Sequence, residues 1–314
     1  MKSKVEISII MGVFNPDKTR FFQAVNSIIH QTFQSWELIL YDDGSDKIGA
    51  QYIRAAAARD HRIAYIRASQ NLGLAHALNA CIERASGRYI ARMDDDDIAA
   101  RDRLEKQYHF LNTHPQFQWV GSNAELFDER GVWGYQKMPE MPEKEDFLFN
   151  SPYIHPSVMF RRQVLIKNGG YSVDRQYRFS EDYELFMRLH RKGNRGYNLQ
   201  EPLLQYFEDY TSHKKRTYKR RIHEMRLRYR GFKDLEILHK GTFHYVLKPL
   251  LIGAVPAPVH HYIRRRMKGR AIGKQNAGDK ENESCDENAG IGREDGTIPA
   301  DMAAVSPNCS DTGK

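Results

Sequence analysis

Residues 71–97 read NLGLAHALNACIERASGRYIARMDDDD, and they contain a helix signal followed at once by a strand signal. The segment LAHALNACIERASG predicts a helix with Gly87 at its C-terminal end, where glycine is favoured. RYIARMDDDD then predicts a buried strand that runs into four consecutive aspartates. A helix that leads directly into a buried strand is typical of a βαβ unit, in which a helix joins two parallel strands.

The preceding residues repeat this alternation. Continuous apolar, β-branched runs predict buried strands at 5–14 (VEISIIMGVF), 36–46 (WELILYDDGSD) and 62–68 (RIAYIRA). Residues 19–33 and 51–60 between them have the composition and spacing of helices. The sequence therefore predicts a doubly wound, Rossmann-like α/β domain with a mostly parallel sheet flanked by helices.

The pattern after Ala99 is looser. Helices are predicted at 102–112 and 180–193, a pair of strands at 118–128 and 131–136, and a strand that enters a helix at 157–169. Residues 211–270 form a basic and apolar extension compatible with helices, and residues 271–314 have a composition that predicts a disordered acidic tail. We accordingly divide the chain into a catalytic-type domain at 1–210, an extension at 211–270 and the tail.

Composition excludes several classes of protein. The chain of 314 residues is 40% hydrophobic and 28% charged, which is typical of a globular protein and not of a membrane bundle. The tail has nine acidic and four basic residues, so the total charge of +8 leaves about +13 on the rest, which favours anionic partners. Three widely spaced cysteines support neither a disulfide framework nor a zinc site. We expect a cytoplasmic protein, because the N-terminus lacks a signal-peptide pattern and prolines interrupt the apolar segment 246–259.

Polar residues follow three of the four predicted strands of the first hundred residues. Asn15 follows the first strand, Asp42 and Asp43 end the second, and the aspartates of residues 94–97 end the fourth. Ligands of open α/β sheets bind outside the carboxyl ends of the strands. The sequence therefore predicts one binding site built from these strand ends.

The aspartate run is the strongest single feature. Alternate residues of an extended segment face the same way, so Asp94 and Asp96 can converge on one point. Adjacent carboxylates repel one another and need a counter-charge, and oxygen ligands select Mg²⁺ or Mn²⁺, which commonly share a diphosphate. The alternative is a solvated acidic loop or a helix N-terminus. Placement directly after a buried strand favours the metal site.

Two other acidic pairs have a structural and a functional interpretation. Asp42 and Asp43 precede a glycine and can simply form a turn, or can accept hydrogen bonds from a nucleotide base or ribose. Glu181 and Asp182 follow Ser180 at a predicted helix start, where acids are favourable in any case. The functional interpretation makes Asp182 a general base for an incoming hydroxyl.

Five segments together resemble glycosyltransferase family 2, whose members have the GT-A fold and include bacterial surface-polysaccharide glycosyltransferases. SIIMGVFN is similar to the family's first-strand motif, and HQTFQSWELILYDDGSD to its second-strand block. Residues 71–97 resemble the stretch that leads into the DXD motif. IHPSVMFRRQVLIKNGGY and SEDYELFMRLHRKG resemble the acceptor-side block and the ED motif. The matches keep the family's order from about Val5 to Tyr206, roughly two-thirds of the chain.

The resemblance implies a role for each matching residue. It implies that Asp96 and Asp94 bind a divalent cation, Mn²⁺ or Mg²⁺, although Asp95 and Asp97 leave the register of the DXD motif open. It implies nucleotide contacts from Phe14, Asn15, Asp43, Asp94 and Asp95, catalysis by Asp182 beside Glu181, and an acceptor side with His155 and Arg161. One position departs from the family pattern: Gly12 stands where a proline is frequent.

The resemblance further implies an inverting transfer from a nucleotide-sugar, with UDP as the default nucleotide, to a saccharide or lipid-linked saccharide. Two alternatives remain. A nucleotidyltransferase would use the same sheet and metal, but MGVFNPD lacks the glycine-rich, basic phosphate loop that it needs. A non-catalytic scaffold that binds saccharide or membrane would have the same fold, yet it would not need Asp96 and Asp182.

The basic segment 213–230, HKKRTYKRRIHEMRLRYR, has aromatic residues interleaved with its cations. No nucleic-acid-binding fold surrounds it, so we expect no nucleic-acid partner. A solvated helix face is one interpretation. The other joins the segment to residues 245–258 and 262–266 as an attachment to an anionic membrane surface, peripheral at the inner face of the cell membrane.

Overall fold

The computed structural model describes residues 5–209, 217–253, 255–256, 258–259 and 261–269. These residues belong to one compact unit, which spans Met1–Ile272. The predicted disordered tail at 271–314 and the first six residues of the predicted extension lie outside the described residues.

A mixed sheet of nine strands forms the centre of the described chain. In spatial order the strands run β3-β2-β1-β4-β8-β6-β9-β5, with β7 paired to β6. The strands are β1 (Ile7–Val13), β2 (Trp36–Asp42), β3 (Ile63–Arg67), β4 (Tyr89–Arg92), β5 (Ile98–Ala99), β6 (Trp119–Asp128), β7 (Gly131–Gln136), β8 (Met159–Arg161) and β9 (Gly196–Phe207).

The sheet is mostly parallel, as the sequence predicts. β1 pairs in parallel with β2 and β4, and β2 pairs in parallel with β3. β8 is antiparallel to both β4 and β6, so those two strands share a direction, and β9 is parallel to β6. β5 and β7 also run against their neighbours. Six of the nine strands therefore point the same way, and their carboxyl ends lie along one edge.

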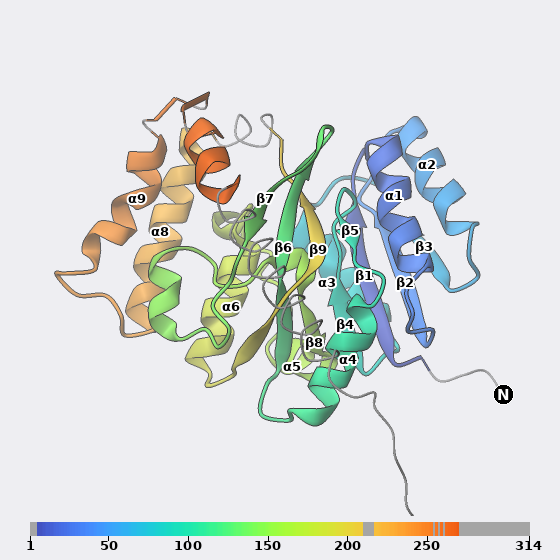
Figure 1. Ribbon diagram of the computed structural model, residues 1–314, viewed down its shortest axis with the longest axis horizontal. Helices are drawn as coiled ribbons and strands as arrows, with labels where there is room; N and C mark the ends of the chain where they lie inside the picture. The colour runs from blue at the N-terminus through green and yellow to red at the C-terminus, as the bar shows by residue number, and fades with distance from the viewer. Residues whose placement is uncertain (1–4, 210–216, 254, 257, 260, 270–314) are drawn as a thin grey trace, which may run out of the picture. The chain divides into compact units, whose positions relative to one another are not determined.

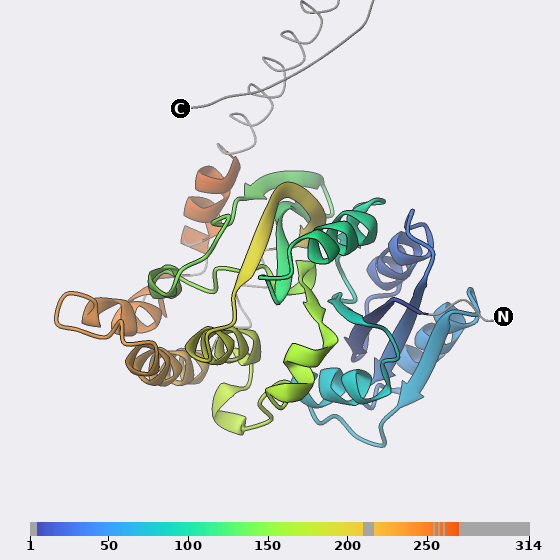
Figure 2. The same ribbon diagram turned by 90° about the horizontal axis from the view of Figure 1, so that it is seen from below.

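Helices cover both faces of the sheet, as Figures 1 and 2 show. One core joins α1, α2 and α4 to side chains such as Leu38 and Leu40, and the other joins α3, α5, α6 and α8 to side chains such as Ile39. The helices are α1 (Lys18–Ile29), α2 (Lys47–Ala57), α3 (Leu74–Arg84), α4 (Arg103–Thr113), α5 (Arg162–Lys167), α6 (Glu181–Arg191), α8 (Tyr218–Asp234) and α9 (Phe243–Gly253), with short 3₁₀ helices η1 (Lys144–Leu148), η2 (His155–Ser157) and η3 (Arg175–Tyr177). The alternating faces of β2 thus explain the predicted two-sided burial.

Gly12 in β1 allows α3 to approach the sheet at the carboxyl end. A Cβ atom at Gly12 would lie 2.9 Å from the Cβ atom of Ala77 and 3.2 Å from Cδ1 of Leu74. The first is closer than real Cβ atoms come, so any side chain here would push α3 outward. The departure from proline at this position therefore has a packing reason.

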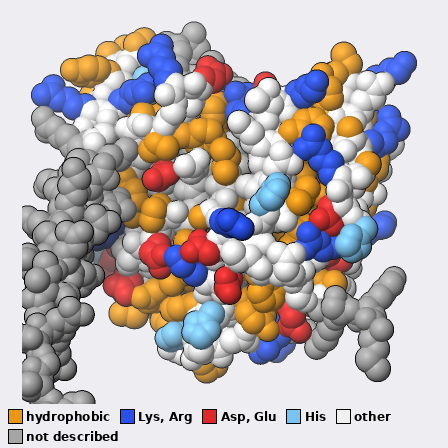
Figure 3. Space-filling view, turned by 45° about the vertical axis from the view of Figure 1, so that its right-hand side comes forward, with side chains coloured by type: hydrophobic (Ala, Val, Ile, Leu, Met, Phe, Trp, Pro, Cys, Tyr) orange, Lys and Arg blue, Asp and Glu red, His pale blue; other side chains and the backbone are white. Residues whose placement is uncertain are grey.

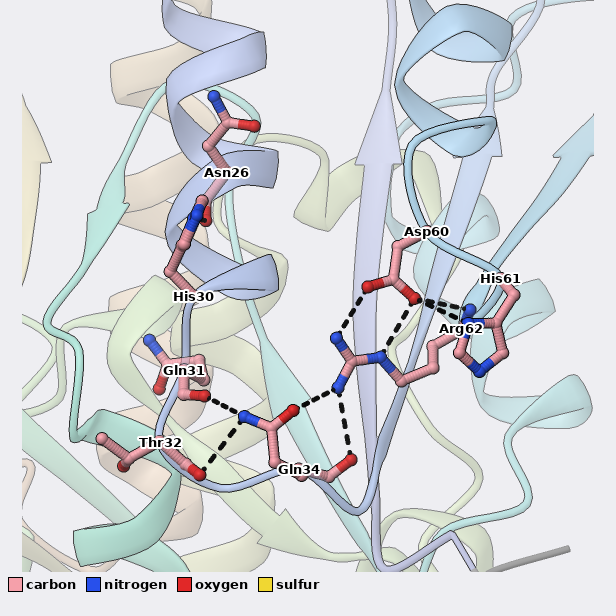
Figure 4. Close-up of polar contacts among 8 residues, drawn as sticks. All are labelled: Asn26, His30, Gln31, Thr32, Gln34, Asp60, His61 and Arg62. Carbon is pink, nitrogen blue, oxygen red and sulfur yellow. Dashed lines mark hydrogen bonds and ion pairs between the residues drawn. The ribbon is translucent and has the colours of Figure 1, made fainter.

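At the opposite edge of the sheet, Arg62 joins two connections, the one before β2 and the one before β3 (Figure 4). Its guanidinium donates to both carboxylate oxygens of Asp60, at 3.0 and 2.6 Å, and to the side-chain oxygen of Gln34 at 2.9 Å. It also lies 3.7 Å from the ring centroid of Trp36 at the start of β2. These contacts fix the amino ends of β2 and β3, far from the polar strand ends.

The described part of the predicted extension packs onto the α/β domain. Leu227 and Phe232 of α8 are buried in the same core cluster as Phe186 of α6. Arg228 is 2% exposed, and it donates to the carbonyl oxygen of Leu148 at 3.0 Å. α8 and α9 lie at the opposite side of the sheet from α1 and α2 in Figure 1. Among the described helices, none combines the length and the apolar character needed to cross a membrane.

Candidate active site

The carboxyl ends of the parallel strands open onto a cavity of about 710 Å³, the donor cavity. Phe14 after β1, Asp43 after β2 and Asp94 after β4 line it, and Glu181 and Asp182 reach it from the start of α6. The fold therefore brings together residues from three strand ends and one helix start, as expected for an α/β sheet.

Phe14 and Asn15, the two predicted nucleotide-binding residues that follow β1, differ in whether they line the cavity. Phe14 is 48% exposed and lines the donor cavity, so its ring face is available to a ligand. Asn15 has a positive φ of 48°, and its side-chain oxygen accepts from the Asp46 backbone N–H at 2.8 Å. Its own N–H donates to the Ser45 hydroxyl at 3.0 Å. Asn15 thus joins the ends of β1 and β2, and it is not among the described residues that line the cavity.

The acids at the end of β2 order the neighbouring loops. The buried carboxylate of Asp43 accepts from the backbone N–H groups of Leu72 and Gly73, at 2.9 and 2.7 Å. It therefore fixes the chain that enters α3 while it lines the donor cavity. Asp42 is fully buried, and it accepts from the Ser45 N–H at 2.8 Å and the Tyr65 hydroxyl at 2.9 Å.

The chain bends after β4 and gathers three of the four aspartates. One carboxylate oxygen each from Asp94, Asp96 and Asp97 lies within 4.8 Å of the other two. Burial, followed by the charge of Asp94, raises the pKa of Asp96 to about 6. Burial, followed by the charges of Asp96 and Asp94, raises the pKa of Asp95 and that of Asp97 well above the usual range. The raised pKa values indicate that the protein supplies too little positive charge to balance this cluster of aspartates.

The oxygen atoms of these three aspartates suit a divalent cation as ligands. All three side chains offer oxygen, the ligand that Mg²⁺ and Mn²⁺ prefer. One oxygen of Asp97 accepts from the Phe207 backbone N–H at 2.8 Å. The other is buried and has no hydrogen-bond partner among the described residues. A buried carboxylate oxygen without a partner, beside two other carboxylates, fits the coordination of a divalent cation.

Two buried arginines lie behind the acidic group, and sequence reasoning missed both. Arg92 of β4 is 3% exposed and forms an ion pair with Asp94. Arg103 of α4 is 1% exposed and donates to the Arg92 carbonyl oxygen at 2.8 Å. Burial lowers the pKa of Arg103 to about 9, and the charge of Asp97 opposes this shift. The sequence did contain a signal for Arg92, which is a lone cation at the end of the apolar strand YIAR, two residues before the first aspartate.

The start of α6 presents two carboxylates to the cavity. Burial raises the pKa of both Glu181 and Asp182. Glu181 is 7% exposed, and its Oε2 atom has no hydrogen-bond partner among the described residues. Arg92 acts on Asp182 in the opposite direction to burial and favours its ionised form. Asp182 is therefore a carboxylate with a raised pKa at the wall of the cavity.

The two predicted acceptor-side residues lie at opposite edges of the sheet. His155 is buried, lines the donor cavity and has its Nε2 atom 2.7 Å from the Tyr171 hydroxyl oxygen. Arg161 pairs with Tyr89 at the amino end of β4, and its guanidinium donates to the carbonyl oxygens of Leu111, His114 and Phe117. Because β8 is antiparallel, its carboxyl end points away from the cavity, and Arg161 is not brought to the site.

A family model described as "Glycosyl transferase family 2" matches residues 8–170, which is more than half of the chain. EpsE of Bacillus subtilis (strain 168), which carries a glycosyltransferase name, is 37% identical over 278 residues and covers 87% of this chain and 98% of its own. The chain belongs to glycosyltransferase family 2.

Other relatives and structures agree with this family and its fold. The amylovoran biosynthesis glycosyltransferase AmsE of Erwinia amylovora is 29% identical over 63% of this chain and 74% of its own. TarS of S. aureus, residues 1–349 with UDP-GlcNAc, superposes with a TM-score of 0.59 at 17% identity over 78% of this chain and 72% of its own. The mannosyltransferase PcManGT of Pyrobaculum calidifontis, with GDP-Man and Mn²⁺, gives 0.55 at 16% identity over 85% and 81%. The chain has the GT-A fold.

This family 2 glycosyltransferase also builds its cavity from the second half of the chain. Arg178 and Phe179 precede α6, Arg220 lies in the first turn of α8, and Arg264 lies in the helical residues 261–269; all four line the donor cavity. Arg264 donates to Glu208 with its Nη2 atom at 2.6 Å. The predicted extension therefore contributes directly to the wall of the site.

Proposed function

We propose that this protein is an inverting, metal-dependent glycosyltransferase that moves a hexosyl or related sugar from a nucleotide-sugar to an acceptor hydroxyl. One observation carries the proposal: Asp94, a member of the acidic group after β4, and the carboxylate of Asp182 line a single cavity. The first can share a cation with a diphosphate, and the second can accept a proton. Both are needed for sugar transfer, and a binding scaffold needs neither.

The donor end of the cavity is built for a nucleotide. The half-exposed ring of Phe14 offers a stacking face for the base. Asp43 lies beside it with both oxygens already ordered by backbone N–H groups, so its remaining lone pairs have fixed directions. Asp94 or Asp95 would accept from the ribose hydroxyls. UDP is our proposed nucleotide, in line with TarS, which binds UDP and UDP-GlcNAc.

Asp94, Asp96 and Asp97 would hold the divalent cation, Mn²⁺ or Mg²⁺. A bound cation of this kind supplies Lewis-acid stabilisation of the charge that develops on the leaving diphosphate. The guanidinium of Arg92 forms an ion pair with Asp94 and orients that carboxylate. Asp97 is anchored by the Phe207 N–H through one oxygen, which leaves the other free in a fixed direction.

Asp182 is the proposed general base. It would accept the proton of the acceptor hydroxyl at a carboxylate oxygen as that hydroxyl attacks the anomeric carbon. Burial raises its pKa and so makes it a better base, while Arg92 keeps the carboxylate available in its ionised form. A single displacement inverts the anomeric configuration, so an α-linked donor would give a β-linked product.

The proposed acceptor is a saccharide or lipid-linked saccharide in cell-surface polysaccharide synthesis, in line with the name of AmsE. We place the reaction at the cytoplasmic membrane surface because α9 exposes an apolar stripe. Phe243, Leu247 and Leu251 are 45%, 37% and 66% exposed at four-residue spacing.

The spread of Lys and Arg in small groups over the face in Figure 3 argues against a broad basic surface for nucleic acid there.

The first test is release of nucleoside diphosphate from UDP-, GDP- and dTDP-sugars with Mn²⁺ or EDTA. We expect metal-dependent turnover of one donor, lost in Asp96→Ala and kept in the control Asp234→Asn on the exposed side of α8. Asp182→Asn should still bind donor but should not transfer the sugar. Absence of any donor binding or turnover would favour the scaffold instead. NMR of the product tests the stereochemistry, and a retained α linkage would rule out the single displacement.

Membrane attachment has its own test. The full chain should sediment with anionic liposomes at low salt, and Leu247→Ser with Leu251→Ser should weaken this sedimentation. Ile48→Ser, a change at an apolar residue that is 59% exposed on α2, is the matched control. Failure of the wild-type chain to sediment would contradict the attachment.

A further inference from the structure

A second cavity of about 500 Å³, the outer cavity, adjoins the donor cavity. The two share lining residues, including Arg178, Phe179 and Glu181. Phe179 has a positive φ of 73°, and two guanidinium groups contact its ring, with Arg220 at 4.0 Å and Arg178 at 5.3 Å from the ring centroid. The shared wall is therefore an ordered stack.

The outer cavity has cations that do not line the donor cavity. Arg175 and Lys219 line the outer cavity and not the donor cavity, as do His76 and His223. Within the described part of the chain, neither Arg175 nor Lys219 forms an ion pair with an acidic side chain. Asp174 also lines the cavity, but its carboxylate accepts from the backbone and side chain of Gln176. The cations are thus left for a ligand.

Three helices begin at this cavity. Residues in the first turn of α3, α6 and α8 line it, and these helices have 11, 11 and 17 residues. Neither α3 nor α6 has a side-chain cap for its first N–H groups, because Gly73 and Ser180 make no capping bond. Helix N-termini carry partial positive charge and bind phosphate and carboxylate groups. Their convergence adds to the charge of Arg175 and Lys219.

Glu181 gives the outer cavity a hydrogen-bond acceptor in addition to its cations. This side chain is 7% exposed, lines both cavities and has an Oε2 atom without a hydrogen-bond partner among the described residues. A carboxylate oxygen that lacks a donor suits a hydroxyl group and repels a phosphate. The cavity therefore offers a hydroxyl site at its inner wall and an anion site at its outer end.

We infer that the outer cavity binds the acceptor, and that this acceptor is a saccharide with a phosphate or diphosphate at its reducing end. Arg175 and Lys219 hold the phosphate, and Glu181 accepts from a sugar hydroxyl next to the proposed base. The identity of the ligand as an acceptor rests on the proposed glycosyltransferase activity. The site itself rests on the arrangement of the cavity.

The test is binding of glucose 1-phosphate to the full-length chain, measured by calorimetry in EDTA so that the proposed cation site does not contribute. Wild type is compared with Arg175→Gln/Lys219→Gln and with the control Arg130→Gln/Lys233→Gln, two exposed cations that line neither cavity. Each charge-assisted hydrogen bond lost should weaken binding by at least about tenfold. We expect that loss only in the first pair, and no binding of methyl α-glucoside at the same concentration.

A farnesyl diphosphate arm identifies the source of the phosphate. Tighter binding than glucose 1-phosphate, lost in Arg175→Gln/Lys219→Gln, supports the site with a lipid-linked acceptor; weaker binding supports it with a soluble glycosyl phosphate. The inference is overturned if that double variant binds glucose 1-phosphate as wild type does, or if methyl α-glucoside binds equally well. Donor turnover is measured in the same proteins. Absence of donor turnover in wild type would contradict the proposed activity. Binding of glucose 1-phosphate that depends on Arg175 and Lys219 would still establish the anion site.

Discussion

Removal of the Arg92 charge should move the pH dependence of catalysis. Arg92 is 3% exposed, and it favours ionised Asp182, whose pKa burial raises. An opposite charge within about 4–6 Å lowers a carboxyl pKa by about 1–3 units. Asp182 makes no ion pair with Arg92 within the described structure, so Arg92 acts on its pKa as a charge through space and opposes the effect of burial. Arg92→Met should therefore raise the pKa of the base.

The sign follows from the role of a general base. The base must be ionised, so activity falls as the pH drops through its pKa. With the pKa raised, the acidic limb of the profile of kcat against pH should move to higher pH, and on that limb each pH unit of movement lowers kcat about tenfold. Arg92→Lys keeps the charge and should leave the limb near its wild-type position. Arg92→Met also removes the ion pair with Asp94 and should lower the plateau, but the pH of the limb is independent of that height.

The assay is nucleoside diphosphate release with saturating donor and acceptor extract from pH 4.5 to 8.5. The reasoning is refuted if the acidic limb of Arg92→Met coincides with that of wild type, or moves to lower pH. A shift of equal size in Arg92→Lys would also refute it, because that result would show that shape, and not charge, controls the limb.

Three further predictions concern the cation, the pH dependence of stability and the docking of α8. Asp97→Asn should weaken Mn²⁺ binding by at least about tenfold and Asp95→Asn should not. Asp97 belongs to the cluster of three aspartates whose oxygens converge, and Asp95 does not. Burial, then Arg195, lowers the pKa of His190 to about 3, so the folded state resists protonation. Stability should thus fall as the pH drops below about 6.5, and His190→Gln should remove about 2 kcal/mol of the loss at pH 5. Arg228→Met should cost about 3 kcal/mol, because it leaves buried carbonyl groups without their donor.

Each of these has a direct measurement. Mn²⁺ affinity is measured by electron paramagnetic resonance, and equal weakening by Asp95→Asn would contradict the assignment of Asp97. Urea unfolding at pH 7.5 and 5.0 tests His190; an unchanged difference between the two pH values in His190→Gln would show that the imidazole does not titrate as stated. The same unfolding assay compares Arg228→Met with Arg226→Met, an exposed arginine on the same helix. Equal stability of those two variants would argue against the docking role.

The first four strands could be predicted because each is a short run rich in apolar residues, although only β1, β2 and β4 are buried on both faces and β3 lies at the edge of the sheet. The predicted runs at 5–14, 36–46, 62–68 and 88–97 contain β1 to β4. β9 was not predicted, although it has twelve residues. Its burial alternates only weakly, Glu201 and Pro202 interrupt it, and its pairing with β6 shifts register near Asn123. An irregular strand has neither the apolar run nor the clean period that sequence reasoning uses.

The candidate site could be predicted where position along the chain fixes position in space. Asp43 and Asp94 follow parallel strands, so the strand ends alone bring them together. Arg161 also follows a strand, but the direction of β8 depends on its partners, which the sequence does not state. The sequence assigned the cation to Asp94 and Asp96, which an extended segment pairs, and left the register open because of Asp95 and Asp97. The bend after β4 instead turns Asp97 toward both.

The balance of charge explains why this site needs a ligand to be complete. Buried carboxylates are costly unless each is paired, and breaking such a pair costs more than the pair contributes. Arg92 and Arg103 compensate the acidic group only in part, since the pKa values of Asp96 and Asp97 are still raised. Asp97 and Glu181 each keep one buried oxygen without a described donor. A cation at the first oxygen and a hydroxyl at the second would each supply the missing partner, so binding at either place should raise the stability of the whole domain.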